Sequence, residues 1–431
     1  MKVLVVGGGG REHALAWKLA QSPAVREVIC QSGNAGMAQV ARCEAEPAGG
    51  VLEMARWAAA ERVDLAVVGP EAYLDLGLVD AFTEHGVPAI GPTRRAAAIE
   101  SSKSFAKELM ARYGVPTAAF AVCDSPAAAR AAVRRMGAPV VVKAEGLAAG
   151  KGVTVCRTLS EAEAAIARTM EERVFGEAGD RVVIEEFLVG EEASILAFVD
   201  GENVLPMVPA QDHKAIGEGD TGPNTGGMGA YSPAPVVTQE IFDRTVAEIF
   251  RPVVKAMAQE DRPYRGILYA GLMITASGPK VVEFNARFGD PETQAILPRL
   301  QSDLVEPFQA ILSGELDKVR LEWDPRAAVC VVMASGGYPG NYRTGYPIYG
   351  LEDAEREEDV IVFHAGTRRE GERVVTDGGR VLGVTALAPT LPEAIERAYA
   401  AVEKIRFEGA YYRRDIGAKA LRRGKDFLPA R

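Results

Sequence analysis

The first hundred residues alternate uniformly apolar strands with helices, and this alternation constrains the fold more than any other feature of the sequence. Such strands carry apolar side chains on both faces, so they predict a parallel sheet that helices cover on both sides. Ligands of these sheets bind beyond the carboxyl ends of the strands, here near residues 7–13, 32–36 and 69–71. The predicted elements are strand 2–6, helix 11–21, strand 26–30, helix 51–61, strand 64–69 and strand 87–91.

The rest of the chain divides into further units. A length of 431 residues predicts roughly two to four domains. Two helical pieces in residues 91–116 end at Gly114 and Pro116 and indicate a boundary, and a last unit begins near Asp324 and Pro325. We therefore predict a mixture of α/β and α+β units, with domains at 1–103, 104–190, 191–324 and 325–431.

Charge and cysteine usage exclude several classes of function. The net charge is −10, and acidic and basic residues are interleaved, so no basic block indicates nucleic-acid binding. The five cysteines are scattered without a Cys-x-x-Cys pair, which excludes a recognisable zinc site. The N-terminus reads as a strand and a glycine turn, not as a signal peptide, and no apolar run is long enough to span a membrane. These features predict a soluble cytoplasmic protein with unpaired thiols.

Consecutive glycines follow the first strand in VVGGGGREHALA, residues 5–16. The dinucleotide fingerprint G-x-G-x-x-G needs a third glycine where this chain has Glu12 or His13, and the second strand ends at Gln31 without an acid, so NAD binding is not predicted. Glycines at a helix N-terminus do form an anion site, because free N–H groups and the helix dipole favour negative charge. We predict a phosphate or sugar site here, against the alternative of a merely tight turn.

The segment VVKAEGLAAGKGV, residues 140–152, looks like a nucleotide-binding loop but is not a P-loop. Only three residues separate Gly146 from Gly150, and Gly152 follows Lys151 where a P-loop has the hydroxyl that holds Mg²⁺. Its glycine N–H groups and lysines can still bind phosphate in another geometry. The alternative is a glycine-rich hairpin with a solvated lysine, and these residues alone do not decide between the two.

The strongest single feature is KVVEFNARFGDPETQ, residues 280–294. Alternation in a strand places Glu283 and Asn285 on one face, and Arg287 continues that face. A carboxylate and an amide oxygen so placed suit Mg²⁺, which proteins hold by one or two side chains plus substrate phosphates. Arg287 could bind a carboxylate or a phosphate through two N–H groups. The alternative is a structural ion pair between Glu283 and Arg287.

Two more segments are rich in polar groups. The carboxylates of VVIEEFLVGEEASI, residues 182–195, indicate either a solvated edge strand, which is the commoner explanation, or a segment between domains that offers backbone groups to an adenine edge. Residues 211–235 contain six glycines and three prolines, and so long a loop is usually functional or disordered. The alternative for its histidine is a surface position. Its polar residues are Asp212, His213, Lys214, Asn224, Thr225, Gly226 and Gly227.

Together these segments resemble the ATP-grasp superfamily, and within it the phosphoribosylamine–glycine ligase family. The resemblance covers essentially the whole chain and rests on VVGGGGREHALA, SSKSFAKELM, VVKAEGLAAGKGV, QDHKAIGEGDTGPNTGGMGAYSPAP and VEFNARFGDPETQ, in this order. The last two also distinguish this family from related carboxylases and ligases. The resemblance implies an ATP-grasp fold, preceded by a Rossmann-like parallel-sheet domain and followed by a small C-terminal α+β domain.

The resemblance also implies a nucleotide site between the two ATP-grasp subdomains. The hairpin 146–152 would close over the triphosphate, and Glu283 and Asn285 match the family's ligands for Mg²⁺ or Mn²⁺. The implied ATP contacts are Lys103 and Lys143 for the phosphates and adenine region, Gly150 and Lys151 on the hairpin, Glu185, Glu186 and Leu188 for adenine, and Glu192 for the ribose.

The implied reaction joins glycine to 5-phosphoribosylamine through glycyl phosphate, converts ATP to ADP and phosphate, and belongs to purine biosynthesis. Lys143, Arg287 and Asp212 would be the catalytic residues, with Asp212 and Arg287 at the two ends of glycine. The implied substrate contacts are Gly8, Gly9, Gly10, Arg11, Glu12, His13, Asn34 and Glu71 for the phosphoribosyl group, and Asp212, His213, Lys214, Thr225, Gly226, Gly227, Arg287 and Asp290 elsewhere in the site.

Two other functions remain open from the residues. One is another ATP-grasp carboxylate–amine ligase or an ATP-dependent carboxylase, and the other is a nucleotide-binding carrier or regulatory module without turnover. The expected partners are ATP, glycine and 5-phosphoribosylamine, with no nucleic acid and no membrane. The resemblance implies a monomer and leaves open a transient contact with the preceding enzyme of the pathway.

Overall fold

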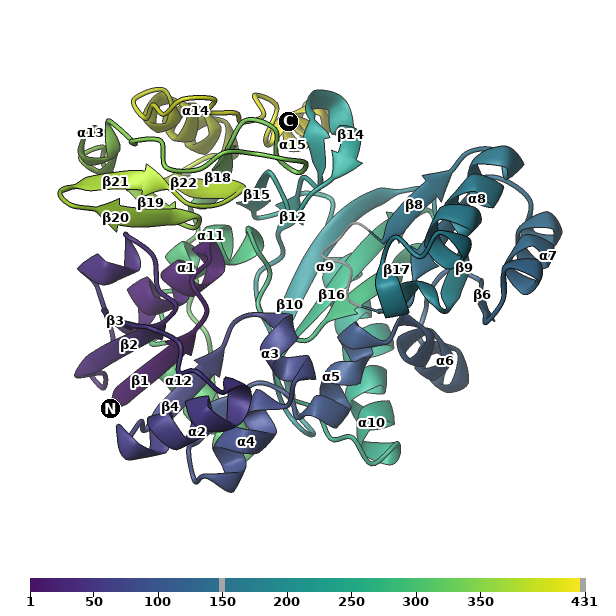
Figure 1. Ribbon diagram of the computed structural model, residues 1–431, viewed down its shortest axis with the longest axis horizontal. Helices are drawn as coiled ribbons and strands as arrows, with labels where there is room; N and C mark the ends of the chain where they lie inside the picture. Colours follow the sequence, from purple (N-terminus) through teal and green to yellow (C-terminus); the bar gives the residue numbers. More distant parts are fainter. Residues whose placement is uncertain (147–151, 427–431) are drawn as a thin grey trace, which may run out of the picture.

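The computed structural model describes residues 1–146 and 152–426. Its N-terminal part is a five-stranded parallel sheet in the order β3-β2-β1-β4-β5 (Figure 1). Helices α2 and α4 pack on one face and α1 on the other, which explains why β1 and β4 are apolar throughout. The elements are β1 Lys2–Val6, α1 Gly10–Leu19, β2 Glu27–Gln31, β3 Arg42–Glu44, α2 Gly50–Ala60, β4 Leu65–Val68, α3 Glu71–Asp75, α4 Leu78–Glu84 and β5 Ala89–Ile90.

The sequence pattern predicts four of these five strands, together with α1 and α2. The strand that it misses, β3, lies at the edge of the sheet and consists of Arg42, Cys43 and Glu44. None of the three side chains is buried, so β3 leaves no apolar run in the sequence.

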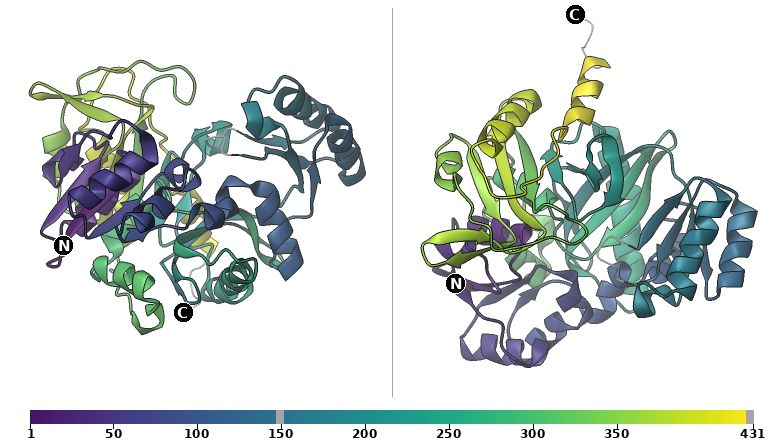
Figure 2. Two further views of the ribbon diagram at one scale, coloured as in Figure 1. Left: turned by 60° about the horizontal axis from the view of Figure 1, so that its bottom comes forward. Right: turned by 45° about the horizontal axis from the view of Figure 1, so that its top comes forward.

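Two connecting helices lead to the first of two central subdomains, whose sheet is antiparallel in the order β6-β9-β7-β8. This subdomain has a hydrophobic core of its own and extends away from the rest of the molecule (Figure 2). Helix α6 begins at Ser102, which accepts a hydrogen bond from the N–H of Phe105, and ends at Gly114 with φ of 69°. The elements are α5 Arg94–Ser101, α6 Lys103–Tyr113, β6 Phe120–Cys123, α7 Pro126–Met136, β7 Val140–Ala144, β8 Val153–Cys156, α8 Leu159–Ile166 and β9 Val182–Glu186.

The second subdomain is built on an antiparallel sheet in the order β11-β10-β16-β17. One face of this sheet shares a hydrophobic core with the N-terminal domain, because Ile195 and Phe284 belong to the same buried cluster as Leu4 and Val6. The two domains therefore pack as one body around the strand that carries Glu283. The elements are β10 Glu191–Asp200, β11 Val204–Pro206, α9 Gln239–Arg244, α10 Arg251–Gln259, β16 Arg265–Thr275, β17 Gly278–Asn285, α11 Glu292–Ile296 and α12 Val305–Ser313.

The C-terminal sheet has the order β12-β15-β18-β22-β19 and takes two of its strands from the glycine-rich segment 211–235. That segment, predicted as a long loop, contains four short strands and is held at both ends by this sheet. The elements are β12 Gln211–Asp212, β13 Ala215–Gly217, β14 Thr221–Asn224, β15 Gly229–Ser232, β18 Ala327–Ala334, α13 Leu351–Glu355, β19 Val360–His364, β20 Thr367–Glu370, β21 Arg373–Thr376, β22 Arg380–Ala388, α14 Leu391–Val402 and α15 Ala418–Asp426.

No helix among the described residues is long and apolar enough to cross a membrane. The domain boundaries predicted at 103, 190 and 324 stay predictions. The strands β15 and β18, which lie on opposite sides of residue 324 in the sequence, pair with each other in one sheet.

Candidate active site between the sheets

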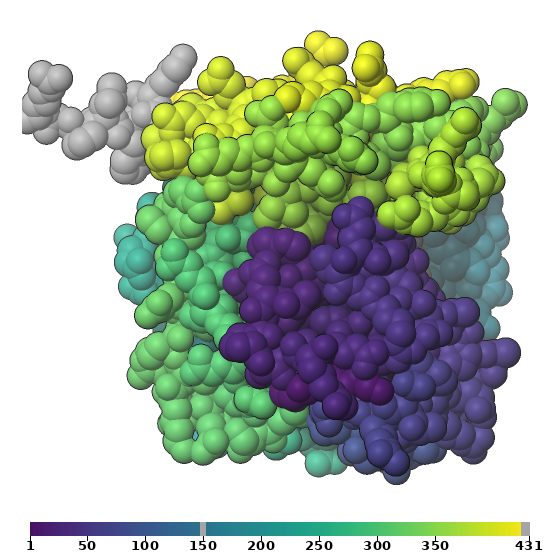
Figure 3. Space-filling model, turned by 90° about the vertical axis from the view of Figure 1, so that its left-hand side faces the viewer, coloured from purple at the N-terminus to yellow at the C-terminus, as the bar shows by residue number. Residues whose placement is uncertain are grey.

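A cleft of about 360 Å³ lies where the N-terminal domain meets the C-terminal one. Figure 3 shows the contact between these domains, with the N-terminal residues in purple below the C-terminal ones in light green and yellow. The cleft is lined by Gly8, Gly9 and Gly10, by residues 32–34, by Asp290, and by the C-terminal residues 365–367, Asp377 and Arg380.

The glycine turn is tightly packed, which favours the anion-site prediction over a merely short turn. A Cβ atom on Gly8 would stand 1.9 Å from the carbonyl oxygen of Ser32, so only glycine fits there. The N-terminus of α1 follows directly at Gly10. The Arg11 N–H there donates to Oδ2 of Asp290 at 3.4 Å, so this end of the helix already faces a negatively charged group, as its dipole favours.

The next side chains of the motif turn inward and do not line the cleft. Glu12 accepts hydrogen bonds from the Gly9 N–H at 2.8 Å and from Nε of Arg11 at 2.6 Å. Nη1 of Arg11 donates to the Phe288 carbonyl at 3.1 Å. These contacts hold the glycine turn in place against the end of β17, so Arg11 and Glu12 support the turn in this structure.

His13 connects the N-terminal helix to the C-terminal sheet. Its Nδ1 accepts a hydrogen bond of 2.8 Å from the backbone N–H of His364, and its ring stands edge-on to Phe363. Burial lowers the pKa of His13 to about 3, with a further lowering from His364. The imidazole is therefore neutral at physiological pH and acts as an acceptor between domains.

Replacing His13 with glutamine is expected to reduce the acid sensitivity of the fold. As pH falls from 6.5 towards 3, the unfolded chain binds a proton at His13 and the folded chain does not, so stability is lost on that side. The free energy of unfolding should therefore depend on pH less steeply in the variant than in the wild type, by about 1.4 kcal/mol per pH unit between about pH 4.5 and 6. Urea unfolding at stepped pH measures the two slopes, and parallel curves would contradict the assignment.

Asn34 and Arg380 hold the walls of the cleft together. Nδ2 of Asn34 donates to the carbonyls of Gly8 at 2.9 Å and His364 at 2.8 Å. Nη1 of Arg380 donates to the carbonyls of Gly226 and Asp290 and forms an ion pair of 3.2 Å with Oδ1 of Asp290. Sequence reasoning missed Arg380, because no motif surrounds it in the sequence.

The strand β17 places the predicted metal ligands as alternation requires. Glu283, Asn285 and Arg287 are partly exposed, while Phe284 and the residues on either side of Arg287 are buried. Nζ of Lys214 lies 3.2 Å from Oε1 of Glu283, and its positive charge lowers the pKa of Glu283 to about 2.

Arg287 joins the N-terminal domain to this strand. It forms ion pairs of 3.2 Å with Glu71 and with Glu100, and its Nη2 donates to Oδ1 of Asn285 at 3.0 Å. The alternative of an ion pair between Glu283 and Arg287 is therefore wrong for the described residues, where Glu283 pairs with Lys214. Burial would raise the pKa of Glu71, but the charges of Arg287 and Arg11 outweigh it and lower the value to about 2.

Glu100, on α5, was not predicted as part of the site. It accepts a hydrogen bond of 2.6 Å from the Ala286 N–H and is buried beside Arg287. Burial raises the pKa of Glu100 to about 7, although the charge of Arg287 opposes the change. No local motif marks this residue, because its role arises from packing α5 against the end of β17.

The predicted nucleotide side of the site contains a buried cluster of two lysines and a glutamate. Nζ of Lys143 lies 2.9 Å from Oε1 of Glu185, and Nζ of Lys107 lies 2.8 Å from Oε2. Lys107 was not predicted, and burial lowers its pKa to about 8 against the raising effect of Glu185. Glu185 thus fixes Lys143, the predicted phosphate contact, through its carboxylate. Since both carboxylate oxygens are occupied by lysines, only the backbone of β9 is left to contact a base.

The other predicted nucleotide contacts lie around this cluster. Nζ of Lys103 donates to the Gly146 carbonyl at 2.9 Å, and Glu192 lies 3.4 Å from Lys214. Glu186 is exposed and Leu188 partly exposed, at the segment that joins the two subdomains. Gly150 and Lys151 lie outside the described residues.

The start of the glycine-rich segment places Asp212 and Lys214 in the site. Asp212 is buried next to Lys214, Glu192 and Tyr269. Burial raises the pKa of Asp212 to about 8, opposed by Lys214. The end of the segment is fixed by Thr225, whose N–H and Oγ1 both donate to the Lys214 carbonyl.

His213 is buried, so the alternative of a surface histidine is wrong. Its ring packs on Tyr231, and the Gly417 N–H donates to Nε2 at 3.4 Å. Its pKa is lowered to about 4 by burial and by the charges of Lys419 and Arg413. In this structure His213 faces the C-terminal unit, away from Glu283.

The donor set on β17 fits a hard divalent cation completed by substrate. Within the described ranges, no three or more His, Cys, Asp or Glu side chains gather to hold a metal alone. A carboxylate and an amide oxygen on one strand face match instead the sparse protein ligation of Mg²⁺, and the ammonium of Lys214 at Glu283 marks the position as one that attracts cations.

Family models match the chain along nearly its full length. Residues 1–100 match the N domain of phosphoribosylglycinamide synthetase, residues 101–293 its ATP-grasp (A) domain and residues 328–419 its C domain. A phosphoribosylamine–glycine ligase from Vibrio cholerae is 54% identical over 426 residues, which cover 98% of this chain and 99% of that protein. The chain belongs to the phosphoribosylamine–glycine ligase family. An Escherichia coli O157:H7 relative of the same name is 55% identical over 427 residues, with 98% and 99% covered.

Solved structures agree with this family. The phosphoribosylamine–glycine ligase of Thermotoga maritima matches with a TM-score of 0.83 and 32% identity, over 96% of this chain and all of that one. The biotin carboxylase domain of Hydrogenobacter thermophilus 2-oxoglutarate carboxylase, solved with MgADP, ADP and bicarbonate, matches with a TM-score of 0.73 at 17% identity, over 95% and 91% of the two chains. The second likeness concerns the fold alone. In this fold an ATP-grasp unit lies between an N-terminal parallel-sheet domain and a C-terminal domain.

Proposed function

We propose that the cleft and the face of β17 together form the site at which this ligase joins glycine to 5-phosphoribosylamine with ATP, as in purine biosynthesis. One observation carries the proposal. Strand β17 carries Glu283 and ends at Asn285, and Asp290, in the segment that follows the strand, lines the cleft between the N- and C-terminal domains. A nucleotide held at the strand and a sugar phosphate held in the cleft would therefore meet at the same strand end.

The reaction proceeds in two displacements. A carboxylate oxygen of glycine attacks the γ-phosphorus of ATP, the bond to ADP breaks, and glycyl phosphate forms. The amine nitrogen of phosphoribosylamine then attacks the glycyl carbonyl carbon, phosphate leaves with the bonding electrons, and the nitrogen loses a proton. The protein contributes mainly alignment and charge neutralisation to such transfers.

Each charged residue of the site has a proposed part in these steps. Glu283 and Asn285 would hold Mg²⁺ or Mn²⁺, which neutralises the phosphate oxygens when bound. Lys143 and Lys103 would contact the phosphates, with Lys143 fixed by the buried Glu185. Arg287 would bind the carboxylate of glycine.

Asp212 would bind the amino group of glycine. Without that ligand, burial keeps its pKa near 8, and an arriving ammonium group restores the ionised form through its positive charge. The phosphoribosyl group would lie in the cleft, with its phosphate at the N-terminus of α1. Glu71, paired with Arg287, would face the sugar from the neighbouring strand end.

Glycyl phosphate hydrolyses readily, so the site has to exclude water during transfer. The glycine-rich segment 211–235 is suited to cover it, because both its ends are hydrogen-bonded into the C-terminal sheet. The Tyr338 hydroxyl accepts a hydrogen bond of 3.0 Å from the Gly226 N–H and adds a further anchor.

The direct test is an assay of ADP release with ATP, glycine and freshly generated 5-phosphoribosylamine. We expect ADP formation to require both glycine and the amine, and bicarbonate not to replace glycine. Release of ADP with bicarbonate would favour the ATP-dependent carboxylase, and nucleotide binding without ADP release under any condition would favour the carrier module.

Three further expectations belong to this proposal. We propose a monomer, with a transient contact to the enzyme that makes the unstable amine. The partners are the three small molecules of the reaction. A cytoplasmic location is supported by the cysteines, all five of which are free thiols.

A further inference from the structure

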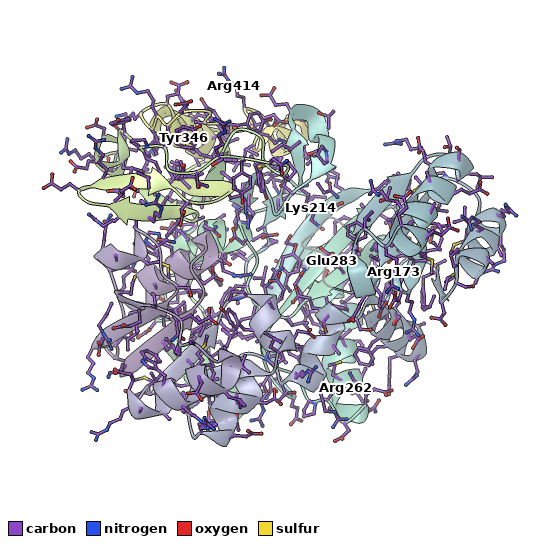
Figure 4. All side chains as sticks on the ribbon, in the orientation of Figure 1. Arg173, Lys214, Arg262, Glu283, Tyr346 and Arg414 are labelled. Carbon is purple, nitrogen blue, oxygen red and sulfur yellow. The ribbon has the colours of Figure 1, made fainter. Side chains whose placement is uncertain are left out.

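Both predicted metal ligands are held by a cationic side chain. Oε1 of Glu283 lies 3.2 Å from Nζ of Lys214, and Oδ1 of Asn285 accepts a hydrogen bond of 3.0 Å from Nη2 of Arg287. Figure 4 labels Lys214 and Glu283, which lie close together near the centre of the molecule. A metal ion that binds these oxygens has to displace both contacts.

Lys214 is also bound on its other side. Its ammonium lies 3.4 Å from Oε2 of Glu192, and Asp212 lines the same small pocket. Its backbone is fixed as well, because Thr225 donates two hydrogen bonds to the Lys214 carbonyl. Because the backbone is fixed, the ammonium can move only by rotation about the side-chain bonds of Lys214, and it stays within reach of these carboxylates.

We propose that Lys214 is a placeholder cation that keeps divalent metal off Glu283 until the triphosphate arrives. This inference rests on the proposed role of Glu283 and Asn285 as metal ligands. An ammonium at 3.2 Å neutralises the carboxylate that a metal ion would otherwise attract. The polyphosphate of ATP offers Lys214 a new anionic partner, so it releases the Glu283 carboxylate as it brings the metal in.

The consequence is that free metal ions bind weakly and metal bound to nucleotide binds well. The test measures Mn²⁺ binding by electron paramagnetic resonance on the full chain without nucleotide. We expect weak binding to the wild type, and an affinity at least about tenfold higher for Lys214→Met, because removal of a charge this close to the ligand is only partly screened.

Two variants control for charge. Lys280→Met removes the same charge from β17, the strand that carries Glu283. Lys280 has the same 28% side-chain exposure as Lys214, and its ammonium lies 4.0 Å from Glu186. This variant should leave Mn²⁺ binding near the wild-type value. Lys214→Arg keeps the charge and should also bind Mn²⁺ weakly. Thermal unfolding with and without Mn²⁺ reports folding, and Mn²⁺ alone should stabilise Lys214→Met more than the wild type.

The outcomes separate this inference from the proposed function. Equal Mn²⁺ affinities for the wild type and a folded Lys214→Met would overturn the placeholder role. An equal rise in Lys280→Met would overturn it too, because a general charge effect would then explain the result. Failure of the wild type to bind Mn²⁺ even with ATP would overturn the metal assignment itself. If Lys214→Met does not fold, Lys214→Gln serves the same comparison.

Discussion

Replacing Glu283 with alanine is expected to lower kcat by at least about a hundredfold while the fold stays intact. The variant loses the only carboxylate among the two predicted metal ligands, so the charge on the transferring phosphoryl group is less well neutralised. Its stability should change by less than about 1 kcal/mol, because the side chain is partly exposed and Lys214 keeps Glu192 as a partner. Steady-state ADP release and thermal unfolding measure the two effects.

A matched control lies on the same strand. Lys280→Ala removes a charged side chain of β17 whose ion-pair partner is Glu186 and not one of the two predicted metal ligands. It should retain most of the activity. If Glu283→Ala turned over as fast as the wild type at saturating Mg²⁺, the assignment of Glu283 as a metal ligand would be wrong.

Arg287→Lys is expected to reduce kcat/KM for glycine by about a hundredfold or more, although the charge is retained. The guanidinium contacts Glu71 through Nε and both Glu100 and Asn285 through Nη2, and a single ammonium group cannot span these positions. The lysine would therefore fail to present a second N–H to the carboxylate of glycine. Initial rates at varied glycine concentration measure the effect, and the KM for ATP should change much less.

Arg265→Lys is the matched control, because it makes the same arginine-to-lysine change outside the proposed site. Arg265 begins β16 and is exposed, so the change should leave the kinetics near wild type. An unchanged KM for glycine in a folded Arg287→Lys would assign the glycine carboxylate to another residue.

The parts of the fold that could be predicted from the sequence are those in which buried side chains recur in a regular pattern along the chain. β1 and β4 are buried at nearly every position, and burial alternates over residues 283–288, so both patterns are visible in the sequence of side chains. The glycine turn was predicted for a related reason, since only glycine lets the backbone approach Ser32 so closely. The family fold, which places these segments in order, is confirmed by the matching of all three domain models.

What the sequence could not predict depends on contacts between distant segments. Glu100, Lys107 and Arg380 each gain a place in the site through a partner on another element, namely Arg287, Glu185 and Asp290. Single charged residues on helices or strand ends carry no local pattern. The partners of Glu283 were missed for the same reason, because Lys214 lies in a different segment of the chain.

The pairing of β15 with β18 means that the chain cannot be divided cleanly at residue 325. A fragment that starts at residue 325 would leave one side of β18 without its neighbour, and an open strand edge recruits other chains. In the complementary fragment, β15 would keep β12 as a neighbour but would lose β18 on its other side. The last quarter of the chain must therefore be synthesised before the segment 211–235 can settle into its sheet, and exchanging that quarter between relatives requires residues 211–232 to be exchanged with it.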